Sequence, residues 1–121
     1  MTSDTLNTPP TRAQLDALSG AALIEFGAAS CGHCQRAQPL IASALQQHGD
    51  GVRHIKVEDG SGKPLGRSFH VTLWPTLIFL RDGREVARLV RPVATGEIVQ
   101  ALGLLTAGPG ASAPGGVTRS C

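Results

Sequence analysis

Aromatic side chains are scarce in this sequence. It contains no tyrosine, a single tryptophan at Trp74 and three phenylalanines, so that aromatic residues make up 3% of the chain. Proteins that hold single-stranded nucleic acid stack the bases on aromatic side chains, and this sequence lacks the side chains for such a platform. The chain also has no basic run, and its net charge is only +2. These shortages argue against a nucleic-acid-binding protein, which needs clustered Lys and Arg to neutralise phosphates.

Long apolar runs are also missing. No stretch approaches the roughly 20 apolar residues that a membrane-spanning helix needs. The N-terminal residues MTSDTLNTPPTRAQ contain neither the basic region nor the apolar region of a secretory signal. Hydrophobic residues make up 41% of the chain and charged residues 17%, which suits a folded globular protein. We therefore expect a cytoplasmic protein that makes no contact with a membrane.

Cysteine is limited to Cys31, Cys34 and Cys121. Three cysteines are too few for a disulfide scaffold. In a reducing compartment, a closely spaced pair is more often catalytic or metal-binding than structural. Cys121 is expected to be an exposed, incidental thiol, with a reactive tail cysteine as the alternative.

The length of 121 residues suits one folded domain. Residues 1–10 are polar and end in two prolines, which indicates a flexible lead-in. Residues 107–121, AGPGASAPGGVTRSC, are rich in Gly and Pro and show no apolar periodicity, which predicts a flexible tail. The domain is therefore expected at residues 11–106.

Helical and strand patterns alternate within this domain. Thr11 is expected to cap a short helix, with Gln14 completing a capping box. Strands are predicted at 22–28, 52–58, 76–81 and 85–90, and further helices at 31–47, at 64–69 and from residue 95. Asp82-Gly83 favours a two-residue hairpin turn between the last two strands. A parallel pair joined by a helix and followed by a hairpin predicts an α/β fold, with a mixed four-stranded sheet and helices on both faces.

The sequence Cys31-Gly32-His33-Cys34 lies where the first predicted strand meets the next helix. Unpaired N–H groups and the helix dipole stabilise a thiolate at a helix N-terminus. Two intervening residues bring both sulfur atoms to one turn, so that Cys34 can attack a mixed disulfide formed at Cys31. We therefore predict a nucleophilic Cys31 and a resolving Cys34 that need no separate cofactor. Half of a zinc site is the alternative, but no second half with matching spacing exists, so we expect no metal.

Two segments resemble the thioredoxin superfamily. The segment EFGAASCGHCQRAQP, residues 25–39, resembles the strand, active-site turn and helix of that family. The segment WPTLIFLRDGREV, residues 74–86, resembles the part that carries the cis-proline and the hairpin. The resemblance covers about residues 11–106 and implies the thioredoxin fold and thiol–disulfide exchange. The Gly-His pair between the cysteines is similar to that of protein disulfide isomerase domains, whereas thioredoxins usually have Gly-Pro.

The resemblance implies roles for residues beside the cysteines. Glu25 stands at the position of the family's buried carboxylate, beneath Cys34. Desolvation would raise its pKa and allow it to take the proton of the resolving thiol, unless it is only a partly exposed strand residue. Ser30, Gly32 and His33 would form the active-site loop. A protonated His33 would stabilise the nucleophilic thiolate, with a solvated surface histidine as the alternative.

The resemblance also implies a client-binding edge at Trp74, Pro75 and Thr76, with a cis peptide bond before the proline. The family generally has a tryptophan directly before the first cysteine, where this chain has Ser30. We interpret Trp74 as restoring that lost apolar surface, and the alternative is that it packs against Phe69 or the loop after the second cysteine.

Two further expectations concern the rest of the domain. His54 and His70 are predicted to be ordinary surface or edge residues. Thioredoxin has an additional N-terminal strand, for which MTSDTLN is a poor candidate, so we expect four strands.

These inferences predict a monomeric thiol–disulfide oxidoreductase. Its partners would be disulfide-containing client proteins and a dithiol donor such as a reductase or glutathione. Two other functions stay open at this point. One is a redox-sensitive client-binding or chaperone-like module without turnover, and the other is a carrier that binds a soft metal ion through Cys31 and Cys34.

Overall fold

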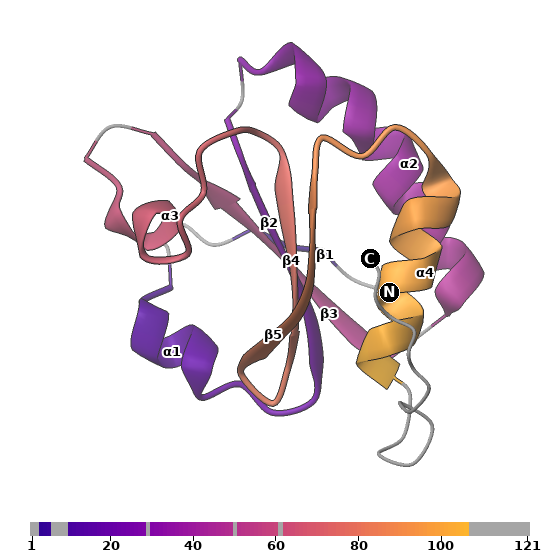
Figure 1. Ribbon diagram of the computed structural model, residues 1–121, viewed down its shortest axis with the longest axis horizontal. Coiled ribbons are helices and arrows are strands. Elements are labelled where there is room, and N and C mark those ends of the chain that lie inside the picture. Colours follow the sequence, from indigo (N-terminus) through magenta and orange to yellow (C-terminus); the bar gives the residue numbers. More distant parts are fainter. Residues whose placement is uncertain (1–2, 6–9, 29, 50, 61, 107–121) are drawn as a thin grey trace.

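The computed structural model describes residues 3–5, 10–28, 30–49, 51–60 and 62–106. Within these ranges, four helices accompany one five-stranded sheet (Figure 1). The elements in chain order are β1 (Ser3–Thr5), α1 (Arg12–Asp16), β2 (Ala21–Gly27), α2 (Gly32–His48), β3 (Val52–Glu58), α3 (Pro64–Ser68), β4 (Thr76–Arg81), β5 (Arg84–Val90) and α4 (Thr95–Thr106). The predicted order of elements is confirmed, and each predicted range begins and ends within one residue of the observed element.

The sheet is mixed, as predicted, and has the strand order β1-β3-β2-β4-β5. Strand β3 is parallel to both β1 and β2, whereas β4 is antiparallel to β2 and to β5. The first parallel pair is joined by α2, and the last two strands form the predicted hairpin. Helices α2 and α4 cover one face of the sheet, and α1 and α3 cover the other (Figure 1).

Strand β1 is present in addition to the four predicted strands. Its three residues pair in parallel with residues 54–56 of β3. A three-residue strand is too short to show an alternating pattern, and its pairing depends on the open edge of β3. The sequence therefore gave no signal for it. The predicted tail at 107–121, including Cys121, lies outside the described residues.

The alternation of side chains along β2 determines which of them pack under α2 and α4 and which pack under α1 and α3. Leu23 belongs to the core under α2 and α4, whereas Ile24 and Phe26 belong to the core under α1 and α3. Because successive side chains of a strand point to opposite faces, Glu25 shares the face of Leu23. The same argument places His54 of β3 on the α2 face, because Ile55 belongs to the opposite core.

The hairpin turn consists of Asp82 and Gly83, as predicted. Both residues have positive φ angles, 52° and 79°, the combination of a type I′ turn. The turn is also tied to the segment that leads into β2. The backbone N–H of Asp82 donates to the carbonyl of Gly20 at 2.9 Å, and the N–H of Gly20 donates to Asp82 Oδ1 at 2.8 Å.

Gly83 packs so closely against α1 that a side chain has no room there. A Cβ atom at this position would lie 1.9 Å from the backbone oxygen of Asp16. We expect Gly83→Ala to lower the free energy of unfolding by about 2–4 kcal/mol, measured by urea denaturation. Gly20→Ala is the matched control, because Gly20 also has a positive φ angle but no atom within 4 Å of its Cβ position. It should lose only about 1 kcal/mol, and equal losses in both variants would refute the close-contact argument.

Candidate active site

Cys31 is the N-cap residue of α2. Its Sγ atom accepts a hydrogen bond from the backbone N–H of Cys34 at 3.1 Å. The sulfur atom therefore takes the place of a capping oxygen, where the unpaired amides of the first turn stabilise negative charge. Cys31 is half-buried, whereas Cys34 is 6% exposed, and both are reduced thiols. The structure thus places the cysteine pair at the strand–helix junction, as predicted.

The surroundings of the two cysteines shift their pKa values in opposite directions. Desolvation works against ionisation of Cys31, but hydrogen bonds from Cys34 and from the backbone of His33 outweigh it. Together with the positive charge of Arg91, they hold the pKa of Cys31 below its ordinary value. Burial raises the pKa of Cys34 to about 11, and the hydrogen bond with Cys31 and the negative charge of Glu25 add to the rise. Cys31 therefore ionises first and Cys34 stays protonated.

His33 does not supply the positive charge that we expected from it. Partial desolvation lowers its pKa, and the positive charges of Arg91 and Arg36 lower it further. A histidine with a lowered pKa is uncharged at neutral pH, because its ordinary value is already about 6.5. The prediction of a protonated His33 beside the thiolate was therefore wrong. The charge that acts on Cys31 comes from Arg91.

Arg91 is a site residue that sequence reasoning missed. It directly follows β5 and has a φ angle of 51°. Its backbone N–H donates to the carbonyl of Pro75 at 2.9 Å, and its Nε donates to the carbonyl of Trp74 at 2.9 Å. Pairing of Val90 with Thr76 returns the chain to this point. The predicted hairpin could have pointed to Arg91, because its pairing register places the residue after β5 beside the residue before β4.

The peptide bond between Trp74 and Pro75 is cis, the isomer that the resemblance implies. Trp74 is half-buried, and its indole Nε1 donates to Asp59 Oδ2 at 2.9 Å. Phe69 pairs instead with Phe26, with ring centroids 5.7 Å apart. The polar partner of the indole is thus Asp59, in the loop after β3, which the sequence did not indicate.

The remaining predicted loop and edge residues lie in three different settings. Ser30 is exposed in the turn before the first cysteine, and Gly32 is exposed as the first residue of α2. Thr76 is 1% exposed, and its hydroxyl donates to the carbonyl of Leu73 at 2.5 Å. The Thr76 side chain is therefore turned toward its own backbone and not toward a client.

Glu25 lies beneath α2 in a buried polar cluster. Its side chain is nearly inaccessible, with the residue 4% exposed. Its Oε1 lies 2.8 Å from Nε2 of His54, and its Oε2 accepts a hydrogen bond from Nε2 of Gln38 at 2.5 Å. The same Gln38 nitrogen lies 3.2 Å from the carbonyl oxygen of Cys34. Gln38 thus connects the carboxylate to the turn of helix that carries the resolving cysteine.

Two expectations about this cluster need correction. Burial does raise the pKa of Glu25, but hydrogen bonds from His54 and Gln38, with electrostatic attraction to His54 and Lys56, outweigh burial and lower it overall. The predicted raised pKa was therefore wrong, and Glu25 is an ionised carboxylate at neutral pH. His54 is not a surface or edge residue either, because only 2% of it is exposed.

The thioredoxin family model matches residues 7–103 of this chain. The chain belongs to the thioredoxin family. Among solved structures, it is similar to thioredoxin 2 from Pseudomonas aeruginosa PAO1 in its reduced form. That likeness has 51% identity and a TM-score of 0.71, and covers 83% of this chain and 96% of the other.

Two curated relatives match shorter parts of this thioredoxin-family protein. Thioredoxin 1 of Synechococcus elongatus is 30% identical over 71 residues, which are 59% of this chain and 66% of that protein. The protein disulfide-isomerase erp38 of Neurospora crassa is 40% identical over 66 residues, 52% of this chain and 18% of that protein. The matched part thus spans just under two thirds of the curated thioredoxin and less than a fifth of the isomerase.

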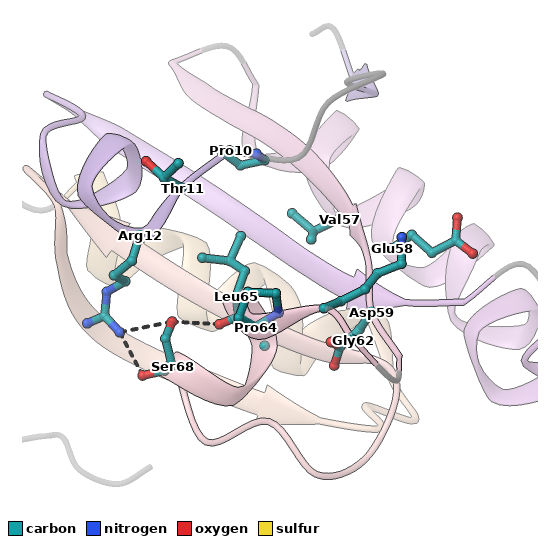
Figure 2. A pocket seen from close by; sticks show the side chains of 12 residues that line it. Pro10, Thr11, Arg12, Val57, Glu58, Asp59, Gly62, Pro64, Leu65 and Ser68 are labelled. Atoms are coloured by element: carbon teal, nitrogen blue, oxygen red, sulfur yellow. Dashed lines mark hydrogen bonds between the residues drawn. The ribbon is translucent and has the colours of Figure 1, made fainter.

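A cavity of about 420 Å³ in this thioredoxin-family protein lies between the start of α1, the end of β3 and α3 (Figure 2). Beside it, Arg12 Nη1 donates to the carbonyl of Ser68 at 2.7 Å. None of the predicted site residues lines this cavity. Its connection to the site is Asp59, which lines it and also binds the Trp74 indole.

Among the described residues, no helix is both long enough and apolar enough to cross a membrane. The same residues contain no group of three or more His, Cys, Asp or Glu side chains that could hold a metal ion.

Gly27, the last residue of β2, makes room for the resolving sulfur. A Cβ atom on Gly27 would lie 2.7 Å from Sγ of Cys34. We expect Gly27→Ala to lower the free energy of unfolding of the reduced protein by about 1–3 kcal/mol, because the buried sulfur would have to move. Gly103→Ala in α4 is the control, since no atom lies within 4 Å of its Cβ position. It should gain up to about 1 kcal/mol from helix propensity, and an unchanged stability of Gly27→Ala would show that the sulfur does not require this glycine.

Proposed function

We propose that this protein is a thiol–disulfide oxidoreductase that reduces or exchanges the disulfides of client proteins. The cycle would run between the dithiol and the disulfide of Cys31 and Cys34. The observation that carries this proposal is the geometry of the cysteine pair: Cys31 caps α2, and its sulfur accepts the backbone N–H of the buried Cys34 at 3.1 Å. The opposite shifts of the two cysteine pKa values support it. Family membership supports the same class of reaction.

In the first step, the Cys31 thiolate attacks one sulfur of a client disulfide. The client S–S bond breaks, a mixed disulfide forms at Cys31, and the other client sulfur leaves as a thiolate. The lowered pKa of Cys31 increases the fraction of attacking thiolate at neutral pH. The half-buried position of its sulfur at the helix N-terminus leaves it open to such an attack.

In the second step, Cys34 gives its proton to Glu25 and attacks Cys31. The mixed disulfide breaks, the second client thiolate leaves, and the Cys31–Cys34 disulfide remains. Two causes of the raised pKa of Cys34 are its hydrogen bond with Cys31 and the charge of that residue. Both change when Cys31 becomes part of a mixed disulfide, which favours ionisation of Cys34 at the moment when it must react.

Apolar side chains around Arg91 provide a surface for the client. Leu73 is 45% exposed, Val90 46% and Val93 82%. Val90 and Val93 lie on either side of the arginine along the chain, and Leu73 precedes Trp74, whose carbonyl accepts the hydrogen of Arg91 Nε. We infer that clients contact these apolar side chains. Cytoplasmic location, a monomeric state and a reductase or glutathione as electron donor stay predictions from the sequence.

Substitution of single cysteines tests the assigned roles. Iodoacetamide at neutral pH should modify Cys31 well before Cys34, as measured by mass spectrometry of the alkylated peptides. Cys31→Ser should reduce insulin disulfides no faster than the dithiol alone, whereas Cys34→Ser should accumulate mixed disulfides with clients. Cys121→Ser should keep its turnover. Equal client trapping by both active-site variants would contradict the roles, and binding of clients without any turnover would favour the chaperone-like alternative.

The hydrogen bond between Trp74 and Asp59 allows a test of the client surface. If Asp59 holds the indole in position for clients, Asp59→Ala should raise the KM for insulin with little change in kcat. A lost hydrogen bond of about 1 kcal/mol corresponds to a rise of about fivefold. Asp59→Asn is the control, because its amide oxygen still accepts the indole hydrogen. Fluorescence of Trp74 should shift in the alanine variant alone. A loss of stability in Asp59→Ala and Trp74→Ile without a change in KM would leave a packing role for the indole.

A further inference from the structure

Arg91 is held against the segment that carries the cis-proline. Its backbone N–H donates to the carbonyl of Pro75 at 2.9 Å, and its Nε donates to the carbonyl of Trp74, also at 2.9 Å. The residue is exposed, yet the hydrogen bond at Nε keeps the guanidinium group in one place. A side chain that is already ordered loses less conformational freedom when it binds a ligand.

Strand pairing places this guanidinium at the same end of the sheet as the cysteines. Thr76, the first residue of β4, pairs with Val90 of β5 on one side and with Phe26 of β2 on the other. Strand β2 ends one residue later, at Gly27, where a Cβ atom would lie 2.7 Å from Sγ of Cys34. The residues that precede β4 and follow β5 therefore share one end of the sheet with the cysteine pair.

Two exposed arginines act on the first turn of α2. The positive charge of Arg91 acts on Cys31 and on His33, and that of Arg36 acts on His33 as well. Arg36 belongs to α2, and its Nη2 lies 3.5 Å from Nδ1 of the uncharged histidine. The negative charge of Glu25, which acts on the resolving thiol, is buried beneath the helix. A client that approaches Cys31 therefore meets a surface of positive potential.

The terminal nitrogens of Arg91 are open to a ligand. In the part of the chain that the structure describes, neither Nη1 nor Nη2 forms a hydrogen bond or an ion pair. Two carboxylates in neighbouring segments bind elsewhere. Asp59 accepts the hydrogen of the Trp74 indole, and Glu97 accepts the backbone N–H of Val93. A guanidinium that is fixed at Nε still presents two terminal N–H groups side by side, the geometry that binds both oxygens of a carboxylate.

We propose that Arg91 binds an acidic side chain next to the client disulfide, so that this protein prefers clients with Asp or Glu beside the reacting cysteine. The proposal rests on the proposed function and adds a substrate class to it. The apolar side chains of Leu73, Val90 and Val93 do not distinguish acidic from basic clients. An oriented guanidinium does, because it attracts the former and repels the latter. Arg91 touches the client and not the reacting sulfur atoms, so its role is in specificity.

Three symmetric peptide disulfides test this preference. They differ only in the two residues that flank the cysteine, which are both Glu, both Gln or both Lys. The reduced protein, in a Cys121→Ser background, is oxidised to the Cys31–Cys34 disulfide, and the peptide disulfide takes up its two electrons and two protons to give two thiols. Rate constants are measured by chromatography of acid-quenched samples. Dividing them by the rate constants for mercaptoethanol with the same peptides removes differences in intrinsic reactivity.

We expect the wild type to react about three- to fivefold faster with the Glu peptide than with the Gln peptide at low ionic strength, the size expected for one exposed ion pair. The Lys peptide should be slower than the Gln peptide, and about 1 M salt should bring the three rates together. Arg91→Gln should lose the preference. Any change that it makes to the reactivity of Cys31 affects all three peptides and cancels in the ratio. Arg84→Gln, at the opposite end of β5, is the control and should keep the preference.

Charge reversal gives a second, independent test. Arg91→Glu should react faster with the Lys peptide than with the Glu peptide. A wild type without preference for the Glu peptide, or an Arg91→Gln that keeps the wild-type preference, would overturn the proposal. Loss of the preference in Arg36→Gln beside a normal Arg91→Gln would overturn it too, because the binding cation would then be Arg36. Should one of the two Arg91 variants not fold, the other decides the matter.

Failure of the proposed function would look different. In that case the wild type would reduce none of the three peptides, or Cys31→Ser would reduce the Gln peptide as fast as the wild type does. Reduction of all three peptides at equal normalised rates would instead leave the oxidoreductase in place and overturn only the role of Arg91.

Discussion

The position of β2 is the constraint on which the active site depends. It is hydrogen-bonded to β3 on one side and to β4 on the other, and helices cover both of its faces. A shift of one residue would move every side chain to the opposite face and would break the packing of both cores. The strand therefore holds Glu25 beneath α2 and ends at Gly27, where the absence of a side chain lets the Cys34 sulfur approach.

Two charges supplied by the sheet reinforce the different chemistry of the cysteines. Beyond burial and hydrogen bonding, Arg91 at the end of the hairpin helps to lower the pKa of Cys31, and Glu25 of β2 helps to raise that of Cys34. The hydrogen bond from the Cys34 backbone N–H to the Cys31 sulfur favours the same order of ionisation. The difference between two chemically identical thiols thus comes first from burial and from hydrogen bonds within the first turn of α2, and the two charges supplied by the sheet add to it.

Local sequence signals predicted the parts of the structure that have local causes. The Thr11 capping box, the Asp82-Gly83 turn and the cysteine pair at a helix start each depend on neighbours within a few residues, and the structure contains all three. The predicted pKa direction of Glu25 was mistaken because its partners His54, Gln38 and Lys56 come from elsewhere in the chain, and the predicted charge of His33 was mistaken in part because Arg91 does. The alternation of side chains along β3 could have predicted that His54 lies on the α2 face, since its neighbour Ile55 faces the opposite core.

The contacts of Arg91 and Asp59 were harder to predict from the sequence. The contact of Arg91 with the Trp74 carbonyl requires the exact return of the hairpin, and the contact of Asp59 with the indole requires the loop after β3 to lie beside the segment before β4. Neither residue belongs to a sequence motif, and the residues adjacent in sequence do not distinguish either one from an ordinary charged surface residue. Strand β1 could not be predicted for a related reason, because it forms only by pairing with β3.

The buried polar cluster is difficult to explain by stability alone. A carboxylate and an imidazole that leave water lose hydration energy, and their attraction often does no more than offset that loss. Apolar side chains would pack beneath α2 as well, as Leu23 and Val52 do on the same face. What apolar residues could not do is act on Cys34, whose pKa Glu25 raises and whose carbonyl Gln38 contacts. A network of carboxylate, amide and imidazole beneath α2 therefore has a role toward the resolving cysteine that a hydrophobic core could not take.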